Sequence, residues 1–170
     1  MIYLGIGSNL SSSIGDRFDN INLAISFLNE YGIKIIKKSS FYETSAYPNK
    51  KDPKFINVVI SIDTLLSPAD LMSKLIFVEE KLERKRNKKN DPRTCDIDII
   101  DYNSQIINFK YKNLTLEIPH KKLTFRNFVL FPLKEISPRW MHPETKEFIG
   151  TLVQKLSDQD RKAILKIEKN

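Results

Sequence analysis

The chain has 170 residues, of which 41% are hydrophobic and 29% charged, the balance of an ordinary globular protein. No apolar run is long enough to cross a bilayer, the first residues lack the pattern of a secretory signal, and the single cysteine cannot form an internal disulfide. We therefore expect one cytoplasmic, monomeric domain over residues 1–170. The net charge of +7 indicates an anionic partner, and charge alone does not separate a polyphosphate from a nucleic acid.

The first half of the chain alternates extended and helical patterns. Residues 1–6 predict a short strand, and apolar residues at steps of three and four predict a helix over residues 14–28. Gly32 stands where a helix end favours a left-handed residue. Residues 33–44 and 55–62 are predicted to be extended. The segment between them is rich in proline, asparagine and aspartate and is predicted to be a loop.

A second helix is predicted after Ser67, which can cap it, with Pro68 at its first position. Its apolar stripe consists of Leu71, Leu75, Val78 and Leu82. The basic run over residues 84–91 follows, and because nothing in it looks fit for burial we expect a mobile loop.

Further strands are predicted over residues 95–102, 106–109 and 114–118, with a turn at residues 103–104. Helices are predicted over residues 125–136, interrupted at Pro132, and over residues 151–156. The order strand, helix, strand, strand, helix, strand predicts an α+β fold. We expect the ferredoxin-like arrangement, a mainly antiparallel sheet flanked by helices.

The strongest chemical signal is the pair Asp96 and Asp98. Residues two apart in a strand share a face, so both carboxylates point one way while Cys95, Ile97 and Ile99 point toward the core. Two adjacent carboxylates repel each other unless a cation lies between them, and oxygen ligands at this spacing suit magnesium bound together with substrate phosphates. The alternative is a solvent-facing strand surface that happens to be acidic.

Arginines near the two acids favour the metal hypothesis. Arg84, Arg86 and Arg93 flank them, and the guanidinium fork matches phosphate oxygens. Acids for a metal beside arginines for phosphate are what phosphoryl-type transfer requires, because that chemistry depends on positioning and charge neutralisation. A solvated loop is the alternative for the basic run, and it explains the lysines better than the arginines.

Several classes of phosphate-handling protein are excluded. The chain has no Gly-x-x-x-x-Gly-Lys-Ser/Thr loop and none of the protein-kinase motifs. The stretch Gly5-Ile6-Gly7-Ser8-Asn9 is too short a signal for a dinucleotide fingerprint, and we interpret it as a turn.

Motifs spread over nearly the whole chain resemble one family, 6-hydroxymethyl-7,8-dihydropterin pyrophosphokinase. They are, in order, Gly7-Ser8-Asn9-Leu10, Ser40-Phe41-Tyr42-Glu43-Thr44, Phe55-Ile56-Asn57, Pro92-Arg93-Thr94-Cys95-Asp96-Ile97-Asp98 and Ile118-Pro119-His120, extended by Arg126, Phe128, Pro132-Leu133 and Ile136-Ser137-Pro138. The block around the two acids is the specific one. The resemblance implies transfer of the terminal pyrophosphate of ATP to the hydroxymethyl group of the pterin, with release of AMP, in folate biosynthesis.

The resemblance also implies roles for individual residues. Asp96 and Asp98 resemble ligands of two magnesium ions, and Arg84 and Arg86 resemble loop arginines that close over the phosphates, so these four form the implied catalytic set. The implied ATP contacts are Glu79, Arg84, Arg86, Arg93, Ile99, His120 and Arg126. The implied pterin pocket comprises Thr44, Ser45, Tyr47, Phe55, Asn57, Asp96 and Phe128. The chain departs from the family in lacking a tryptophan shortly before Pro92.

Physical reasoning supports part of this pocket. A pterin is flat and carries donors and acceptors along one edge, so Phe55 and Phe128 can enclose its faces while the Asn57 amide pairs with the edge. The alternative places both phenylalanines in the core, the commoner position for this residue type. We interpret His142 as a surface residue and Trp140 as a packing residue.

Two rival functions are considered. Nucleotidyltransferases also combine Gly-Ser with Asp-x-Asp, but there the glycine and serine lie close before the acids, whereas Ser8 lies far from Asp96 in this chain. An RNA-binding domain on a ferredoxin-like sheet would carry an Arg/Lys-Gly-Phe/Tyr stacking motif, which is absent. We therefore expect small-molecule substrates, and neither a nucleic-acid nor a membrane partner.

Overall fold

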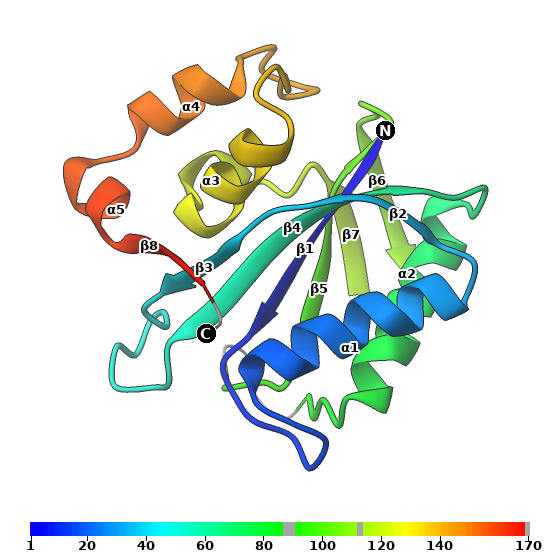
Figure 1. Cartoon of the computed structure of the whole chain (residues 1–170). Coiled ribbons are helices and arrows are strands. Elements are labelled where there is room, and N and C mark those ends of the chain that lie inside the picture. Colours follow the sequence, from blue (N-terminus) through cyan, green and yellow to red (C-terminus); the bar gives the residue numbers. More distant parts are fainter. Residues whose placement is uncertain (87–90, 112–113, 169–170) are drawn as a thin grey trace.

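The computed structural model describes residues 1–86, 91–111 and 114–168 (Figure 1). The first half of the chain forms β1 (Ile2–Ser8), α1 (Arg17–Glu30), β2 (Lys34–Lys38), β3 (Phe41–Thr44), β4 (Phe55–Asp63) and α2 (Pro68–Lys81). The second half forms β5 (Asp96–Tyr102), β6 (Ile107–Tyr111), β7 (Leu114–Ile118), the short 3-10 helix Leu123–Phe125, α3 (Asn127–Ile136), α4 (Ile149–Lys155), α5 (Asp158–Lys162) and β8 (Ile164–Ile167).

The main sheet is antiparallel throughout and has the strand order β5, β1, β4, β3, β8, with β2 also paired to β4. Strands β2 and β3 pair with successive parts of β4, so together they occupy the place of one strand. Helix α1 follows β1, and α2 follows β4. This is the predicted ferredoxin-like order, to which β8 adds an edge strand. Strands β6 and β7 form a separate hairpin.

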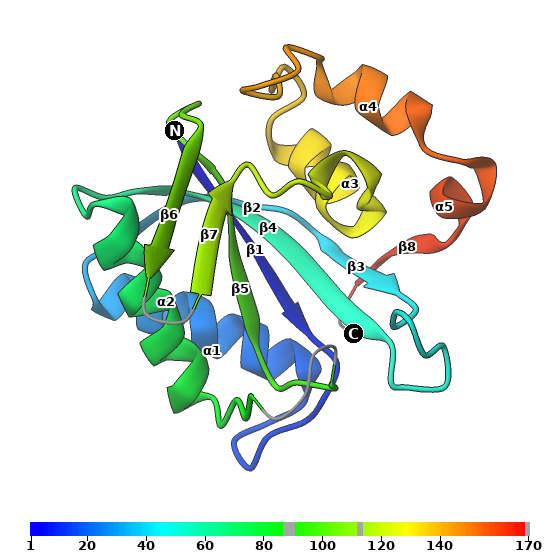
Figure 2. The ribbon, with the colours of Figure 1, turned by 180° about the vertical axis from the view of Figure 1, so that it is seen from behind.

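Helices cover both faces of the sheet, as Figures 1 and 2 show from opposite sides. Along β1, Leu4 and Ile6 point into the core under α1 and α2, while Tyr3 points into a second core under α3 and α4. Cys95 lies in the first core, as expected of a small apolar side chain. Among the residues that the structure describes, no helix combines the length and apolar character that crossing a membrane requires.

Local sequence signals account for both long helices. The Asp16 side chain accepts hydrogen bonds from two backbone N–H groups at the start of α1 and forms a capping box with Asp19. Gly32, with φ of 77°, takes the left-handed conformation just after that helix. Ser67 caps α2 as predicted, and all four residues of the predicted apolar stripe are fully buried.

Two predictions about elements are wrong, and two elements were not predicted. The Gly5–Ser8 stretch is not a turn, because β1 continues to Ser8. Pro132 does not interrupt α3, since Leu130, Leu133 and Ile136 bury one side of that helix on the sheet and offset the lost backbone hydrogen bond. Helix α5 and strand β8 were not anticipated, because each is short and Ile164 is the one buried residue of β8.

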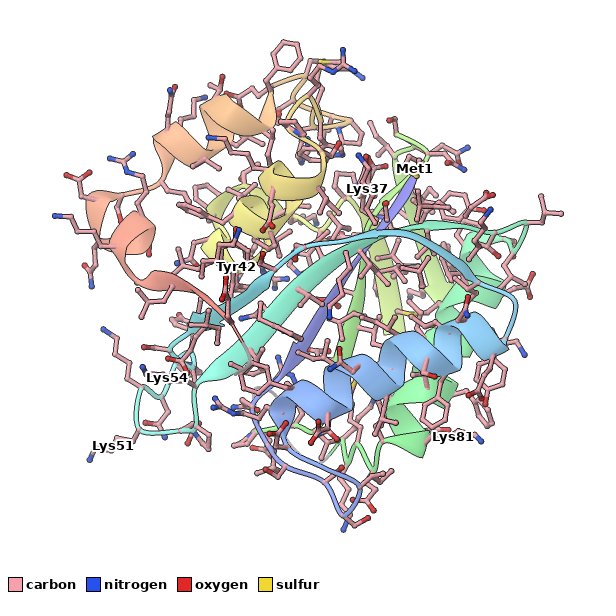
Figure 3. All side chains as sticks on the ribbon, in the orientation of Figure 1. Met1, Lys37, Tyr42, Lys51, Lys54 and Lys81 are labelled. Atoms are coloured by element: carbon pink, nitrogen blue, oxygen red, sulfur yellow. The ribbon has the colours of Figure 1, made fainter. Side chains whose placement is uncertain are left out.

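Tyr42 joins β3 to the helices of the second face (Figure 3). Its hydroxyl donates to Glu135 on α3 at 2.8 Å, and the Ser40 hydroxyl donates to the same carboxylate at 2.8 Å. Burial and the Glu135 carboxylate raise the pKa of Tyr42, so the hydroxyl keeps its proton. These bonds hold α3 over the end of the sheet where the two acids lie.

His142 is buried, with 4% of its surface exposed, so its interpretation as a surface residue is wrong. Its Nδ1 accepts backbone hydrogen bonds from Glu144 at 3.2 Å and Thr145 at 3.1 Å, which close the turn before α4. Trp140 is buried beside it, as predicted for a packing residue, and donates its Nε1–H to Asp101 at 2.7 Å.

The buried ring makes stability pH-dependent. Burial lowers the pKa of His142 below its ordinary 6.5, so the folded state binds fewer protons than the unfolded state. The free energy of unfolding should therefore fall as the pH drops below 6.5. The total loss is about 1.4 kcal/mol for each unit by which the pKa in the folded state lies below the pKa in the unfolded state. His142→Asn keeps an acceptor in place of Nδ1 but does not titrate. Denaturant unfolding at several pH values should show a flatter profile for the variant, and identical profiles would contradict this assignment.

Candidate active site

Strand β5 carries the two predicted acids on one face. Asp96 and Asp98 lie on the side of α3, while Ile97 and Ile99 are buried in the core under α1 and α2. The predicted alternation is therefore confirmed. In register with them on β1 lie Gly7, opposite Asp96, and Gly5, opposite Asp98.

On the face of β1 beside these acids, Gly7 contributes backbone and no side chain, whereas the Ile100 side chain covers Gly5, with its Cδ1 3.3 Å from where a Cβ atom would lie. On its other side Gly7 pairs with Asn57 of β4, so the order across the sheet is Asp96, Gly7, Asn57. Two strand spacings, roughly 10 Å, separate the acid from the amide. A Cβ atom at Gly7 would lie 3.1 Å from Asn57 Oδ1 and 3.6 Å from a ring carbon of Phe55. The absence of a side chain at Gly7 lets Asn57 and Phe55 approach the backbone here, and we call this backbone surface the floor.

Arginines engage both acids. Asp96 Oδ1 lies 2.5 Å from Arg84 Nη1, and Asp96 Oδ2 lies 2.7 Å from Arg93 Nε. Asp98 has a looser partner, Arg126 Nη1 at 3.6 Å, and its side chain is 53% exposed. Each Asp96 oxygen thus has an arginine nitrogen close by, whereas Asp98 has only the one longer contact.

Glu79 of α2 lies behind this cluster and is 2% exposed. Its carboxylate accepts hydrogen bonds from Arg84 and Arg86 and, at 2.7 Å, from the Ile97 N–H of β5. The Arg84 side chain is only 10% exposed, so the expectation that nothing in the basic run is buried is wrong for this residue. Residues 87–90 of the predicted mobile loop lie outside the described residues.

The electrostatics of the three carboxylates differ. Burial works against ionisation of Asp96, but the Arg84 and Arg93 guanidinium groups outweigh it and hold its pKa below the ordinary value. Although its side chain is half exposed, partial loss of hydration and repulsion from Asp96 raise the pKa of Asp98 to about 6. Burial raises the pKa of Glu79 to about 7 against the attraction of Arg84 and Arg86. Of the three, Asp98 is the most exposed and the one without a close arginine, so it is the most accessible to an added cation.

The donor set fits magnesium only as a partial site. Asp96 and Asp98 supply hard oxygen ligands on one face, and Asp98 lacks a close cation. Among the described residues, no group of three or more acidic, histidine or cysteine side chains is arranged to hold a metal ion. A carboxylate pair completed by substrate phosphates is a common way of binding Mg²⁺ in proteins.

Three of the predicted pterin residues, Thr44, Phe55 and Asn57, lie on β3 and β4 on the far side of the floor. The Asn57 side chain is buried, and its Nδ2 donates to Thr44 Oγ1 at 3.1 Å and to the Tyr42 carbonyl at 3.4 Å. These bonds explain how the strand tolerates a buried amide. Phe55 and Phe128 are both half-buried, so neither is fully enclosed in a core.

The structure does not gather every predicted residue. The Ile99 side chain lies in the core under α2, so only its backbone is left for a nucleotide. Ser45 and Tyr47 lie exposed in the loop after β3, Tyr47 at 82%. His120 does join the site, because its Nε2 lies 3.2 Å from Arg126 Nη2. Burial and the Arg126 charge lower the pKa of His120.

Two residues of the site had no predicted role there. Gly7 forms the floor, and Asn9 ties together the loops on its two sides. Asn9 Nδ2 donates to the Pro53 carbonyl at 3.0 Å, and Asn9 Oδ1 accepts the Arg93 N–H at 2.7 Å. The signal was the polar run that ends a buried strand, which is unusual unless each polar group has a partner.

A hollow of about 390 Å³ lies elsewhere, beside Tyr3, Trp140 and His142, and contains none of the predicted site residues. Its one carboxylate, Asp101, accepts from Trp140 Nε1 and from the Ser104 N–H, both at 2.7 Å. Because both oxygens of Asp101 accept hydrogen bonds, the residues that line this hollow include no unpaired carboxylate.

Two acids on a strand edge, with arginines on both sides and an open floor beside them, are typical of a metal-dependent enzyme acting on a polyphosphate. The comparisons with known proteins narrow this class. Residues 3–138 match the model of the family "7,8-dihydro-6-hydroxymethylpterin-pyrophosphokinase (HPPK)". The chain belongs to this family.

Several known proteins are similar to this chain. The 2-amino-4-hydroxy-6-hydroxymethyldihydropteridine pyrophosphokinase of Aquifex aeolicus is 39% identical over 84% of the chain and 83% of its own length. The folic acid synthesis protein fol1 of Pneumocystis carinii is 37% identical over 96% of the chain, which spans only 21% of that longer protein. The crystal structure of Plasmodium falciparum HPPK-DHPS shares the fold, with a TM-score of 0.72 at 16% identity, over 91% of this chain and 44% of that one.

The glycine floor can be tested with Gly7→Ala. The added methyl group would crowd the Asn57 amide, and overpacking of this kind costs about 1–3 kcal/mol. We expect weaker binding of 6-hydroxymethyl-7,8-dihydropterin, measured by calorimetry, with the fold retained. Gly150→Ala is the matched control, because a Cβ atom there meets nothing within 4 Å. Equal pterin affinity in both variants would show that pterin binding does not require glycine at position 7.

The metal assignment can be tested without turnover. Asp98→Asn keeps the size of the side chain but removes the charge that a cation would neutralise. Binding of α,β-methylene ATP should strengthen on addition of Mg²⁺ in the wild type, and this gain should shrink at least about tenfold in the variant. Calorimetric titrations with and without Mg²⁺ measure it. The same magnesium dependence in both proteins would remove Asp98 from the site.

Proposed function

We propose that this protein transfers the terminal pyrophosphate of ATP to the hydroxymethyl group of 6-hydroxymethyl-7,8-dihydropterin and releases AMP, as a step of folate biosynthesis. The observation that carries the proposal is the order across the sheet: Asp96 and Asp98, the glycine floor of β1, then Asn57. This arrangement offers one place for charged phosphates and another, a short distance away, for a flat polar heterocycle.

The reaction follows from this arrangement. The pterin hydroxyl oxygen attacks the β-phosphorus of ATP, the bond from that phosphorus to the oxygen bridging to the α-phosphorus breaks, and AMP leaves with that oxygen. The hydroxyl proton passes to solvent or to a carboxylate of the site. The protein contributes mainly positioning and charge neutralisation, since little covalent chemistry is asked of it.

Magnesium ions bound by Asp96 and Asp98 would supply neutralisation of phosphate charge. Arg93 and Arg126, each beside one of these acids, would bind phosphate oxygens. His120, next to Arg126, is a further hydrogen-bonding partner for a phosphate.

Arg84 and Arg86 have a different role, because both are paired with carboxylates in the free protein. In the free protein both pair with Glu79, and Arg84 also pairs with Asp96. Phosphates offer these guanidinium groups a more highly charged partner, so ATP should draw them away from the carboxylates. Release of Arg84 would free an oxygen of Asp96 for a metal, which couples binding of the nucleotide to completion of the site.

The test is incubation of the protein with ATP, Mg²⁺ and the hydroxymethyl dihydropterin. AMP should form in step with pyrophosphorylated pterin, and release of pyrophosphate instead would indicate nucleotidyl transfer. Asp98→Ala should lower kcat on the order of 100-fold or more. Asp63→Ala, which removes an exposed acid at the other end of the sheet, is the control and should leave kcat unchanged. Failure to form AMP with the wild type would refute the proposal.

A further inference from the structure

Each of the two site acids contacts an arginine that in turn lies against an aromatic ring. In the first acid–arginine–ring set, Arg93 Nε lies 2.7 Å from Asp96 Oδ2, and the Arg93 guanidinium carbon lies 5.0 Å from the centre of the Phe55 ring. This distance is within the range of a cation–π interaction. The guanidinium is thus held by a carboxylate and by a ring.

The second set has the same acid–arginine–ring pattern, with residues from different elements. Arg126 Nη1 lies 3.6 Å from Asp98 Oδ2, and its guanidinium carbon lies 5.5 Å from the centre of the Phe128 ring at the start of α3. Phe55 comes from β4 and Phe128 from α3, so the two sets are built from different parts of the fold.

We propose that Phe55 and Phe128 are positioning residues for Arg93 and Arg126, and that they strengthen binding of ATP even when no pterin is present. The inference rests on the proposed function, which assigns phosphates to the arginines and the pterin to the rings. It adds that the two substrate sites share these aromatic side chains.

The rings act by limiting where long side chains can go. An arginine has several rotatable bonds, and ordering it on binding a phosphate costs conformational entropy. A guanidinium attracted to a ring face loses part of that freedom beforehand. The side chains of Arg93 and Arg126 remain 23% and 25% exposed, so they are partly covered and yet accessible to a ligand.

The backbones of both arginines are placed without the rings. The Arg93 N–H donates to Asn9 Oδ1, and the Arg93 carbonyl accepts from the backbone N–H groups of Asn9 and Leu10. The Arg126 carbonyl accepts the N–H groups of Val129 and Leu130 at the start of α3. Loss of a ring should therefore change the guanidinium position and leave the chain path intact.

A shared ring also couples the two substrates. One face of each ring carries a guanidinium, so a pterin must use the other face or displace the arginine. In either case the occupant of one site changes the environment of the other. Coupling between binding sites is reciprocal, so ATP and pterin should each alter the affinity of the other by the same factor.

The experiment measures binding of α,β-methylene ATP with Mg²⁺ by calorimetry in the absence of pterin. Phe55→Leu and Phe128→Leu should each weaken binding roughly two- to fivefold, the range expected for one cation–π contact. Phe55→Tyr keeps a ring face and should retain wild-type affinity. Phe77→Leu is the matched control: it removes a ring that also has a cation above it, Lys81 at 5.5 Å, on the far side of α2, and should not alter affinity.

A double-mutant cycle separates positioning from general damage to the fold. In an Arg93→Ala background, Phe55→Leu should have no further effect on nucleotide affinity, because the arginine through which the ring acts is gone. A ring that serves only as a pterin platform predicts unchanged affinity in both leucine variants, and that result would overturn the proposal. Equal losses with and without Arg93 would also overturn it. The outcome is independent of whether AMP forms, so failure of the proposed function would be recognised separately.

Discussion

Two like charges on one face of β5 impose the requirement that the rest of the site meets. Neighbouring carboxylates in a partly dry setting are costly unless positive charge surrounds them. The protein brings arginines to them from the basic run after α2, from the segment before β5 and from the start of α3. The same cations that stabilise the free protein are the groups a polyphosphate needs, so the site is held together by the interactions that its ligand would replace.

Glu79 is a buried carboxylate that holds two of these arginines beside the acids. A buried carboxylate is tolerated because Arg84, Arg86 and the Ile97 N–H all donate to it. It joins α2 to β5, the strand that bears the acids. Glu79 therefore has a structural role in the site, whereas the family resemblance implies for it only a contact with ATP.

Much of this could be predicted from the sequence, because period and capping signals act locally. The stripe of α2, the turn after Tyr102 and the alternation around Asp98 all follow from short-range patterns. What failed depended on distant partners. Gly7 looks like a turn until β4 and β5 are seen on either side of it, and His142 looks exposed until two backbone N–H groups are found on its ring. Burial of Arg84 likewise depends on carboxylates from two other elements.

The glycine strand at the centre of the site has one more consequence. Because β1 contributes backbone rather than side chains to the floor, the stiffness of that floor is the stiffness of the sheet, with partners on both sides. Its amide hydrogens should be among the slowest in the protein to exchange with solvent, whereas those of the arginine-bearing segments around it should exchange sooner. A rigid surface would then select the ligand by the shape of its heterocycle. Side chains that rearrange on a faster timescale would select it by the charge of its phosphates.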